Sequence, residues 1–222
     1  MKSKKSGRRE SILVLCAHSD DQILGVGGAI AKFAKEGKEV NIVIFSYGEK
    51  SHPWLKKHVI ADIRIKESEQ ASNIVGAKQT IFFNMEEGKF KEDFDKKRVA
   101  QRLEKLVKQF KPTKIFTHSP DDPLPDHKSV SNLVLNFCKK IKFKGDVYSF
   151  DVWNTFNRKT GQYPKMVVDI TKTFGTKLKA LKVFQSQKIH AIAVLIGVVY
   201  WRAIKNGLWN HCRFAEVFYK IY

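Results

Sequence analysis

Short apolar runs alternate with longer amphipathic stretches along this chain. Runs rich in β-branched and aromatic residues predict strands at residues 12–17, 40–45, 80–83, 114–117, 147–150 and 166–170. Several of these runs are apolar at every position, which is typical of strands covered on both faces. Residues 94–110 predict a helix, because apolar side chains recur there at three- and four-residue spacing and Pro112 follows. The alternation predicts an α/β fold in a single domain spanning residues 1–222, with a mostly parallel sheet between helical layers.

Polar clusters follow two of the predicted strands. His18, Asp20 and Asp21 come directly after the strand at 12–17, and the segment from His118 to His127 follows the strand at 114–117. Ligand sites of such sheets lie beyond the carboxyl ends of the strands. We therefore expect the two clusters to meet in one crevice.

The residue types in these clusters favour a metal site. Adjacent carboxylates repel each other and are costly to desolvate unless a cation lies between them. His18 and Asp21, three residues apart across a turn into a helix, can face a common point, and His127 offers a third ligand. Three such ligands with one open position suit catalytic zinc, although other divalent ions accept the same donors.

The remaining acids of the clusters have predicted roles beside the metal. Asp20 would point away from the ligands and act as a general base on water. Asp126 would steady a neighbouring histidine. The alternatives are that Asp20 and Asp21 cap a helix, and that His127 is simply exposed. The glycines of "GVGG" predict close packing of a helix against a strand.

The net charge indicates what kind of partner the protein binds, and the cysteine content indicates its cellular compartment. The chain has a formal net charge of +19, which suggests an anionic partner such as a phosphorylated sugar or a lipid head-group surface. Basic residues are spread along the chain without an aromatic-basic block, so we do not expect nucleic-acid binding. Cys16, Cys138 and Cys212 lie far apart in the sequence and predict a reducing, cytoplasmic location.

Two apolar or basic segments bear on targeting. Residues 1–10 predict a flexible basic tail, and the short apolar run after them lacks the features of a secretory signal. Residues 191–201 are too few to span a membrane, and we expect them to be a buried core segment. The alternative is an interfacial contact at the inner membrane surface.

Several segments resemble the motifs of one enzyme family. "AHSDDQILGVGG" is similar to the AHPDDE-type opening of the LmbE-like zinc deacetylases, which include N-acetylglucosaminyl-phosphatidylinositol de-N-acetylase. "RIKESEQASNIVGAKQTIFFNMEEG" and "HSPDDPLPDHKSV" resemble the family's R-x-x-E and HPDH-type segments. "KALKVFQSQ" and "RFAEVF" resemble its A-L…S-Q and Y-A-E-x-F segments.

The resemblance implies a Rossmann-like three-layer fold and removal of an acetyl group from a sugar amine, by water activated on zinc. It implies that His18, Asp21 and His127 hold zinc and that Asp20 is the general base. Arg64 matches a family arginine that contacts the sugar, and Glu87 lies near a family aspartate. The expected substrate is an N-acetylglucosamine-type conjugate, phosphorylated or lipid-linked. Its exact identity and the oligomeric state stay open.

The chain departs from the family pattern at three positions. Ser19 replaces a proline, which we expect to cost only some rigidity, and Gln22 replaces an acid. Leu124 replaces the first histidine of HPDH, which stabilises the oxyanion or protonates the leaving group. His118 could substitute as a catalytic residue, or it could pack at the strand end. A catalytically impaired or non-catalytic sugar- or lipid-binding protein is therefore the alternative to an active enzyme.

Overall fold

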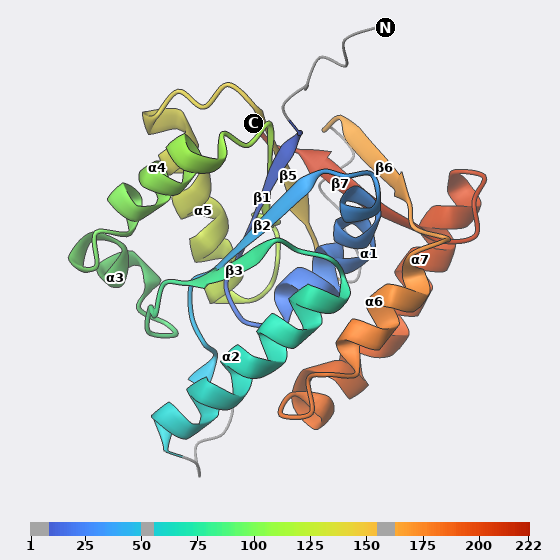
Figure 1. The fold of residues 1–222 in the computed structure, drawn as a ribbon, viewed down its shortest axis with the longest axis horizontal. Coiled ribbons are helices and arrows are strands. Elements are labelled where there is room, and N and C mark those ends of the chain that lie inside the picture. Colours follow the sequence, from blue (N-terminus) through green and yellow to red (C-terminus); the bar gives the residue numbers. More distant parts are fainter. Residues whose placement is uncertain (1–8, 50–55, 155–162) are drawn as a thin grey trace, which may run out of the picture.

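One mixed sheet forms the centre of the protein. The computed structural model describes residues 9–49, 56–154 and 163–222, and in these ranges seven strands have the order β3-β2-β1-β4-β5-β7-β6 (Figure 1). The strands are β1 (Ser11–Cys16), β2 (Glu39–Ile44), β3 (Gln79–Phe82), β4 (Lys114–His118), β5 (Asp146–Phe150), β6 (Lys165–Asp169) and β7 (Ala215–Lys220). The five strands from β3 to β5 are parallel, and β7 is antiparallel to both β5 and β6.

Helices cover both faces of the sheet. They are α1 (Asp21–Lys35), α2 (Lys57–Ile74), α3 (Phe90–Lys96), α4 (Val99–Phe110), α5 (Pro125–Lys140), α6 (Phe174–Leu181) and α7 (Ala193–Trp209), with a short π-helix at Lys188–Ile192. Apolar side chains of α1, α2, α6 and α7 form one core with the sheet, and those of α3, α4 and α5 form the other. Figure 1 shows these two groups of helices on opposite sides of the strands. The predicted three-layer α/β fold is confirmed.

The six predicted strands are present within one residue of their expected bounds. Two features differ from the prediction. The helix expected at 94–110 is two helices, because Arg98 has a φ of 50° between α3 and α4, where no α-helix can continue. β7 was not predicted as a strand, because "AEVFYK" mixes charged and apolar residues in a short segment.

Helix α7 contains most of the segment predicted to be core. Leu195, Val199 and Ala203 are buried against the sheet. Trp201 is 55% exposed and Val194 is 58% exposed, so only one face of the segment is core and the prediction was wrong for the other face. In the described part of the chain, no helix is long and apolar enough to cross a membrane. Most of the predicted basic tail, residues 1–8, lies outside the described residues.

Sheet topology determines where a ligand can bind. The chain leaves β1 toward β2 on one side, whereas β4 pairs with β1 on the other side and leads on to β5. The connections that follow β1 and β4 therefore diverge, and this switch point is where parallel sheets of this kind bind ligands. Both polar clusters of the sequence follow these two strands.

Candidate active site

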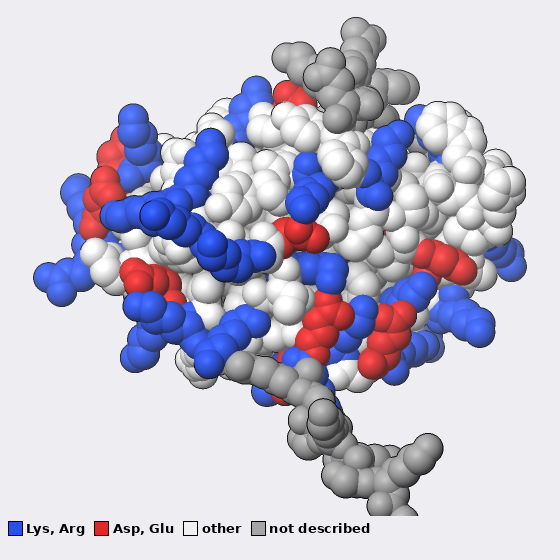
Figure 2. All heavy atoms as spheres, turned by 90° about the horizontal axis from the view of Figure 1, so that it is seen from above, with Lys and Arg blue, Asp and Glu red and all other residues white. Residues whose placement is uncertain are grey.

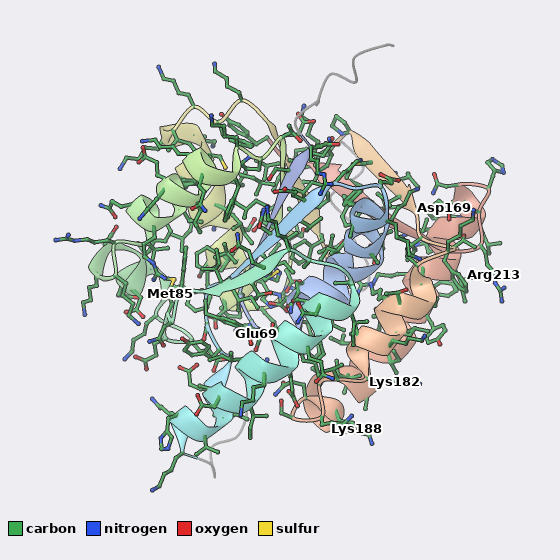
Figure 3. The ribbon with its side chains drawn as sticks, in the orientation of Figure 1. Glu69, Met85, Asp169, Lys182, Lys188 and Arg213 are labelled. Atoms are coloured by element: carbon green, nitrogen blue, oxygen red, sulfur yellow. The ribbon has the colours of Figure 1, made fainter. Side chains whose placement is uncertain are left out.

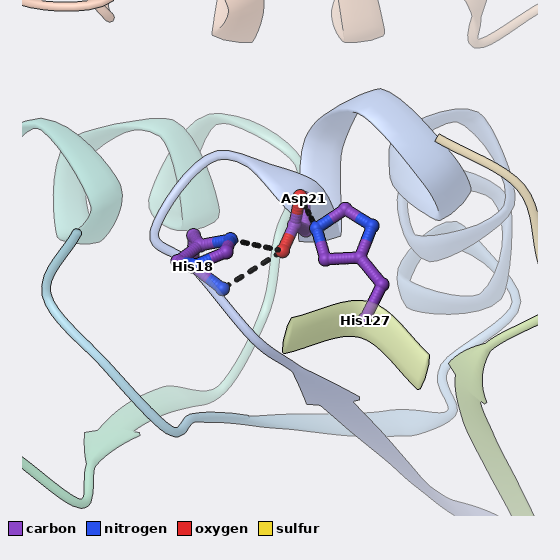
Figure 4. A group of neighbouring side chains, drawn as sticks. All are labelled: His18, Asp21 and His127. Atoms are coloured by element: carbon purple, nitrogen blue, oxygen red, sulfur yellow. Dashed lines mark hydrogen bonds and ion pairs between the residues drawn. The ribbon is translucent and has the colours of Figure 1, made fainter. Parts of the chain in front are cut away.

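Three side chains from three elements meet at the switch point (Figure 4). His18 lies in the turn after β1, Asp21 is the first residue of α1, and His127 lies in the first turn of α5. Asp21 Oδ1 is 3.3 Å from His127 Nε2, and Asp21 Oδ2 is 3.6 Å from His18 Nδ1. Asp21 Oδ2 also accepts a 2.8 Å hydrogen bond from the backbone N–H of His18, which fixes the carboxylate between the two rings.

The donor set of His18, Asp21 and His127 fits a divalent metal ion. Each residue offers one ligand atom, and these atoms lie within 4.8 Å of one another. Two ligands about 2.1 Å from a tetrahedral zinc ion are about 3.4 Å apart, close to the distances from Asp21 to the two histidines. His127 Nε2 is buried and lies within ion-pair distance of Asp21, but no well-aligned hydrogen bond uses its lone pair. That lone pair is the one that a metal would take.

A second group, His118, Asp122 and His127, also has ligand atoms near one another. Two of its three members, His118 and Asp122, already accept hydrogen bonds from the backbone. His118 Nε2 accepts a 2.9 Å hydrogen bond from the backbone N–H of Ala17, and Asp122 accepts hydrogen bonds from the N–H groups of Leu124 and Trp153. The group that contains His18 is therefore the better metal site.

Two carboxylates contact the outer nitrogens of the candidate ligands. Asp122 Oδ1 is 3.0 Å from His127 Nδ1, and Asp126 Oδ2 is 3.2 Å from His18 Nε2. Such a carboxylate fixes the tautomer of a histidine and leaves its other nitrogen for the metal. Asp126 thus lies where a stabilising role was predicted. Asp122 is fully buried and was missed, because the sequence alone could not separate it from the adjacent Asp121.

The electrostatics of the cluster favour positive charge at its centre. Burial opposes protonation of His18, but the Asp126 and Asp21 carboxylates outweigh it and raise the pKa of His18 to about 10. Burial also opposes protonation of His127, where Asp21 and Asp122 raise the pKa to about 9. For Asp21, burial raises the pKa, but the facing His127 and His118 bring the pKa well below its usual value.

Asp20 lies beside the centre without serving as a helix cap. It is the N-cap residue of α1, but its side chain makes no capping hydrogen bond, so the capping alternative does not apply to it. Arg64 Nη2 is 3.5 Å from Asp20 Oδ1. Burial raises the pKa of Asp20, while Arg64 lowers it and the neighbouring Asp21 raises it further. A buried carboxylate with a raised pKa suits a general base.

Arg64 is held inside the protein by residues of two loops, the one after β1 and the one after β2. The side chain is 4% exposed, and it donates hydrogen bonds to Ser19 Oγ at 2.9 Å and to the Gly48 carbonyl at 2.8 Å. Gly48 has a φ of +76°, and a Cβ there would lie 2.2 Å from Arg64 Nη1. In the structure, Arg64 thus contacts Ser19, Gly48 and Asp20. Its predicted role in substrate binding stays a prediction.

The two substituted positions of the opening motif are both hydrogen-bonded. Ser19 Oγ donates to the Tyr47 carbonyl at 2.9 Å in addition to accepting from Arg64. Gln22 Nε2 donates to Ser68 Oγ at 2.8 Å and to the Ser19 carbonyl at 3.1 Å. These bonds restrain the loop that carries His18 and Asp20. The rigidity expected to be lost with proline is thus supplied by Ser19.

His118 is close to the candidate ligands but is fully buried. Its ring stacks on that of His127 with centroids 3.9 Å apart, and Phe150 contacts it at 4.7 Å. Nε2 is 3.2 Å from Asp21 Oδ2. Burial and the facing His127 lower the pKa of His118 to about 4, so the ring is neutral near pH 7. Its catalytic role stays a prediction, and its ring packs against that of His127.

Leu124 and Glu87 complete the surroundings of the cluster. Leu124 is half-buried at the N-cap of α5, immediately before Pro125, and brings no polar group there. Glu87 Oε1 is 3.5 Å from His18 Nε2, so it faces the same side of the ring as Asp126. Its predicted contact with substrate stays a prediction.

The fold and the site together define an α/β protein with a buried His/Asp metal-type centre at the switch point of its sheet. Comparison with known families agrees with this class. Residues 13–138 match the family model described as PIG-L, GlcNAc-PI de-N-acetylase, and the chain belongs to this family.

Similar proteins of two activities are known. The 4-oxalmesaconate hydratase of Pseudomonas putida is 27% identical to this chain. The alignment covers 81% of this chain and 75% of the hydratase. An uncharacterized deacetylase of Escherichia coli, YaiS, is 26% identical over 82% of this chain and 94% of its own length.

Solved structures share the fold. The GalB hydratase of P. putida superposes with a TM-score of 0.81 at 23% identity, covering 96% of each chain. N,N'-diacetylchitobiose deacetylase of Pyrococcus horikoshii superposes with a TM-score of 0.78 at 23% identity, covering 96% of this chain and 84% of its own. The family and these neighbours therefore include both deacetylases and hydratases.

Proposed function

We propose that this protein is a zinc-dependent hydrolase that removes the N-acetyl group from an N-acetylglucosamine-type sugar conjugate. The single observation that carries the proposal is the meeting of His18, Asp21 and His127 around one point, with Asp20 beside them. Membership of the PIG-L family and the similarity to deacetylases support the reaction.

His18, Asp21 and His127 would hold the metal, and zinc is the ion that their donors suit best. When bound, a divalent ion would supply the positive charge that polarises the amide carbonyl and acidifies water. Asp122 and Asp126 would orient the two histidines.

Asp20 would move the proton in this reaction. Its carboxylate accepts a proton from the attacking water, so that a C–O bond forms at the amide carbon. The C–N bond then breaks, and the same proton passes to the nitrogen of the leaving amine. The products are acetate and a free amino sugar. Arg64, whose Nη2 is 3.5 Å from Asp20 Oδ1, would hold this carboxylate in place.

The net charge of the protein leads us to propose that the substrate carries an anionic group. The net charge of +19 favours a phosphorylated or lipid-linked conjugate over a neutral sugar. Lys and Arg side chains are spread over the face shown in Figure 2, with acidic groups among them, and this pattern does not favour nucleic acid.

A second candidate function is hydration of a carbon–carbon double bond. The observation that favours it is the 27% identity to a hydratase together with Leu124, which removes the histidine expected to assist amide cleavage. Both reactions need activated water and a base, so Asp20 and the metal centre would serve either.

The test is product analysis of the zinc-loaded protein with a panel of N-acetylglucosamine conjugates. We expect acetate and free amine in equal amounts, and Asp20→Asn should lower the rate about 100- to 10,000-fold. Asp121→Asn, the matched control outside the cluster, should leave the rate unchanged. Absence of acetate from every conjugate, or an active Asp20→Asn variant, would contradict the proposal. Water addition to an unsaturated acid without acetate release would favour the hydratase.

We also propose that the protein works in the cytoplasm and contacts the inner membrane surface. All three cysteines are free, as a reducing compartment would keep them. Helix α7 also exposes Val194 and Tyr200, which suit a membrane interface. Sedimentation with anionic vesicles, compared with neutral ones, tests this location.

A further inference from the structure

A cavity of about 270 Å³ lies between α7, β7 and the second turn of α1, and we call it the α7 cavity. Leu24 and Gly25 of α1, Asp151 after β5, and Arg202 of α7 are among its lining residues. None of the candidate metal ligands lines it. The α7 cavity is therefore separate from the active site described above.

Its lining carries more positive than negative charge. Lys165, Lys177, Arg202 and Lys205 line the cavity, with Glu216 and Asp151 as its acidic side chains. Lys177 Nζ forms an ion pair with Glu216 at 2.7 Å. Among the described residues, Lys165, Arg202 and Lys205 form no ion pair, although the carboxylates of Asp151, Asp122 and Glu216 lie near enough to act on the charge of Arg202. These three cations around one partly open space attract an oxyanion.

Aromatic side chains line the same space. Trp201, Trp209 and Tyr219 contribute to its wall, and Lys205 Nζ lies 4.6 Å from the centre of the Trp209 ring. Lys165 Nζ lies 5.8 Å from the centre of the Tyr219 ring. Small-molecule sites combine aromatic walls with a few polar groups that fix the ligand. The volume is sufficient for a small ring that bears one oxyanion.

The cavity is connected to the candidate metal centre through the segment after β5. Arg202 donates hydrogen bonds to the carbonyls of Asp151 and Val152 at 2.7 and 2.8 Å. The N–H groups of Val152 and Trp153 donate to Asp122 at 3.4 and 3.2 Å. Asp122 in turn contacts His127, as described above.

A second contact runs through Phe150. A Cβ on Gly25 would lie 2.2 Å from the Phe150 ring, so this ring packs directly against the helix wall of the cavity. On the other side, Phe150 contacts His118. The same short segment thus faces the cavity on one side and the metal centre on the other.

We propose that the α7 cavity is a second ligand site, which binds a small phosphate-bearing sugar and is linked to the metal centre through Arg202. The phosphate lies among Lys165, Arg202 and Lys205, and the ring of the ligand contacts the tryptophans. The binding part of this proposal is independent of the proposed function, whereas the linkage rests on the proposed metal centre.

The binding test is calorimetric titration of the whole chain at physiological salt with a hexose 6-phosphate, inorganic phosphate, glucuronate and glucose. We expect saturable binding of the hexose 6-phosphate and none of glucose. Lys165→Ala combined with Lys205→Ala should weaken binding about tenfold or more, since each lysine makes a charge-assisted contact. Thermal melting checks that the variant stays folded.

The matched control removes the same charge elsewhere. Lys182 and Lys188, which Figure 3 labels at the outer side of α6 and beyond it, do not line the cavity. Lys182→Ala combined with Lys188→Ala should leave the affinity unchanged. An equal loss in this control, no loss in the cavity variant, or no binding of any oxyanion would overturn the proposal. Tighter binding of glucuronate would overturn the preference for phosphate.

The linkage is tested by measuring zinc affinity with and without saturating hexose 6-phosphate. Reciprocal coupling predicts a change of about fivefold or more in the wild type. In the Lys165→Ala, Lys205→Ala variant, hexose 6-phosphate should leave the zinc affinity unchanged. Any change seen there measures direct binding of zinc by the phosphate in solution. Equal behaviour of the two proteins would overturn the linkage. A protein that binds the phosphate but no zinc would instead refute the proposed function.

Discussion

At the scale of single residues, the centre depends on how each side chain is held. Asp21 accepts the His18 backbone N–H, Asp122 contacts His127, and Asp126 contacts His18. The proximity of His18 and His127 could be predicted from the sequence, because polar residues follow two strands whose ends adjoin. The contact of Asp122 with His127 could not be predicted from the sequence, because only the fold decides which residue of the pair at 121–122 is buried.

Asp122 offers a direct test of this support. Asp122→Asn should lower zinc affinity about 10- to 100-fold, because the amide no longer accepts from His127 as a carboxylate does. Asp121→Asn, one residue earlier and without a contact to His127, should have no effect. Competition with a chelating dye measures both. Equal affinities of the two variants would show that Asp122 has no such role.

Leu124 offers the opposite kind of test, a gain of activity. Leu124→His restores the polar group that the family motif has at this position. If the reaction is de-N-acetylation, the rate of acetate release should rise about 100-fold or more. In comparable sites, removal of one positioned hydrogen-bond donor lowers the rate by about this factor. Leu208→His, at an exposed position of α7, is the control. A zinc-loaded Leu124→His variant with unchanged rate would count against the assigned chemistry.

At the scale of elements, hydrogen bonds between motif segments hold distant parts of the chain together. Glu67 of α2 accepts the backbone N–H of Ser186 at 2.9 Å, so the R-x-x-E and S-Q segments meet. Glu216 of β7 accepts the N–H groups of Gly28 and Ala29, so the segment that resembles Y-A-E-x-F contacts α1. The sequence shows that all of these motif segments are present in one chain. It could not predict their contacts, which arise from distant parts of the chain.

Glycine positions in the helices test the packing of α1. Gly25→Ala places a methyl group against Phe150, and we expect a loss of about 1–3 kcal/mol in the free energy of unfolding. At Gly197 of α7 nothing lies within 4 Å of an added Cβ, so Gly197→Ala should gain about 0.5–1 kcal/mol. Chemical denaturation of both variants gives the comparison. A destabilised Gly197→Ala with an unaffected Gly25→Ala would contradict the described packing.

At the scale of the whole molecule, a buried ion pair joins the helices of one face to β7, the strand between β5 and β6. Lys177 of α6 pairs with Glu216 of β7 and donates to the Leu24 carbonyl of α1 at 2.8 Å. The parallel strands, the helix layers and the position of the crevice could be predicted from the alternating patterns along the sequence. The antiparallel strand β7 and this ion pair depend on long-range contacts, which the local pattern does not contain.

Removal of one partner of this pair should destabilise the fold. Lys177→Met leaves Glu216 buried without a cation, and we expect a loss of about 3 kcal/mol in the free energy of unfolding. Lys177→Met combined with Glu216→Gln should recover part of that loss, because the second change removes the unpaired charge. Urea unfolding of the single and double variants measures this. A single variant as stable as the wild type would show that the pair has no structural role.

The central claim is that the turn after β1 and the start of α5 share one divalent ion. The direct measurement is metal content after reconstitution with zinc, by mass spectrometry of the purified chain. We predict about one ion per wild-type chain, almost none in His127→Ala, and full occupancy in His58→Ala, an exposed histidine of α2. A wild-type protein without bound metal, or a His127→Ala variant that keeps its ion, would contradict the account.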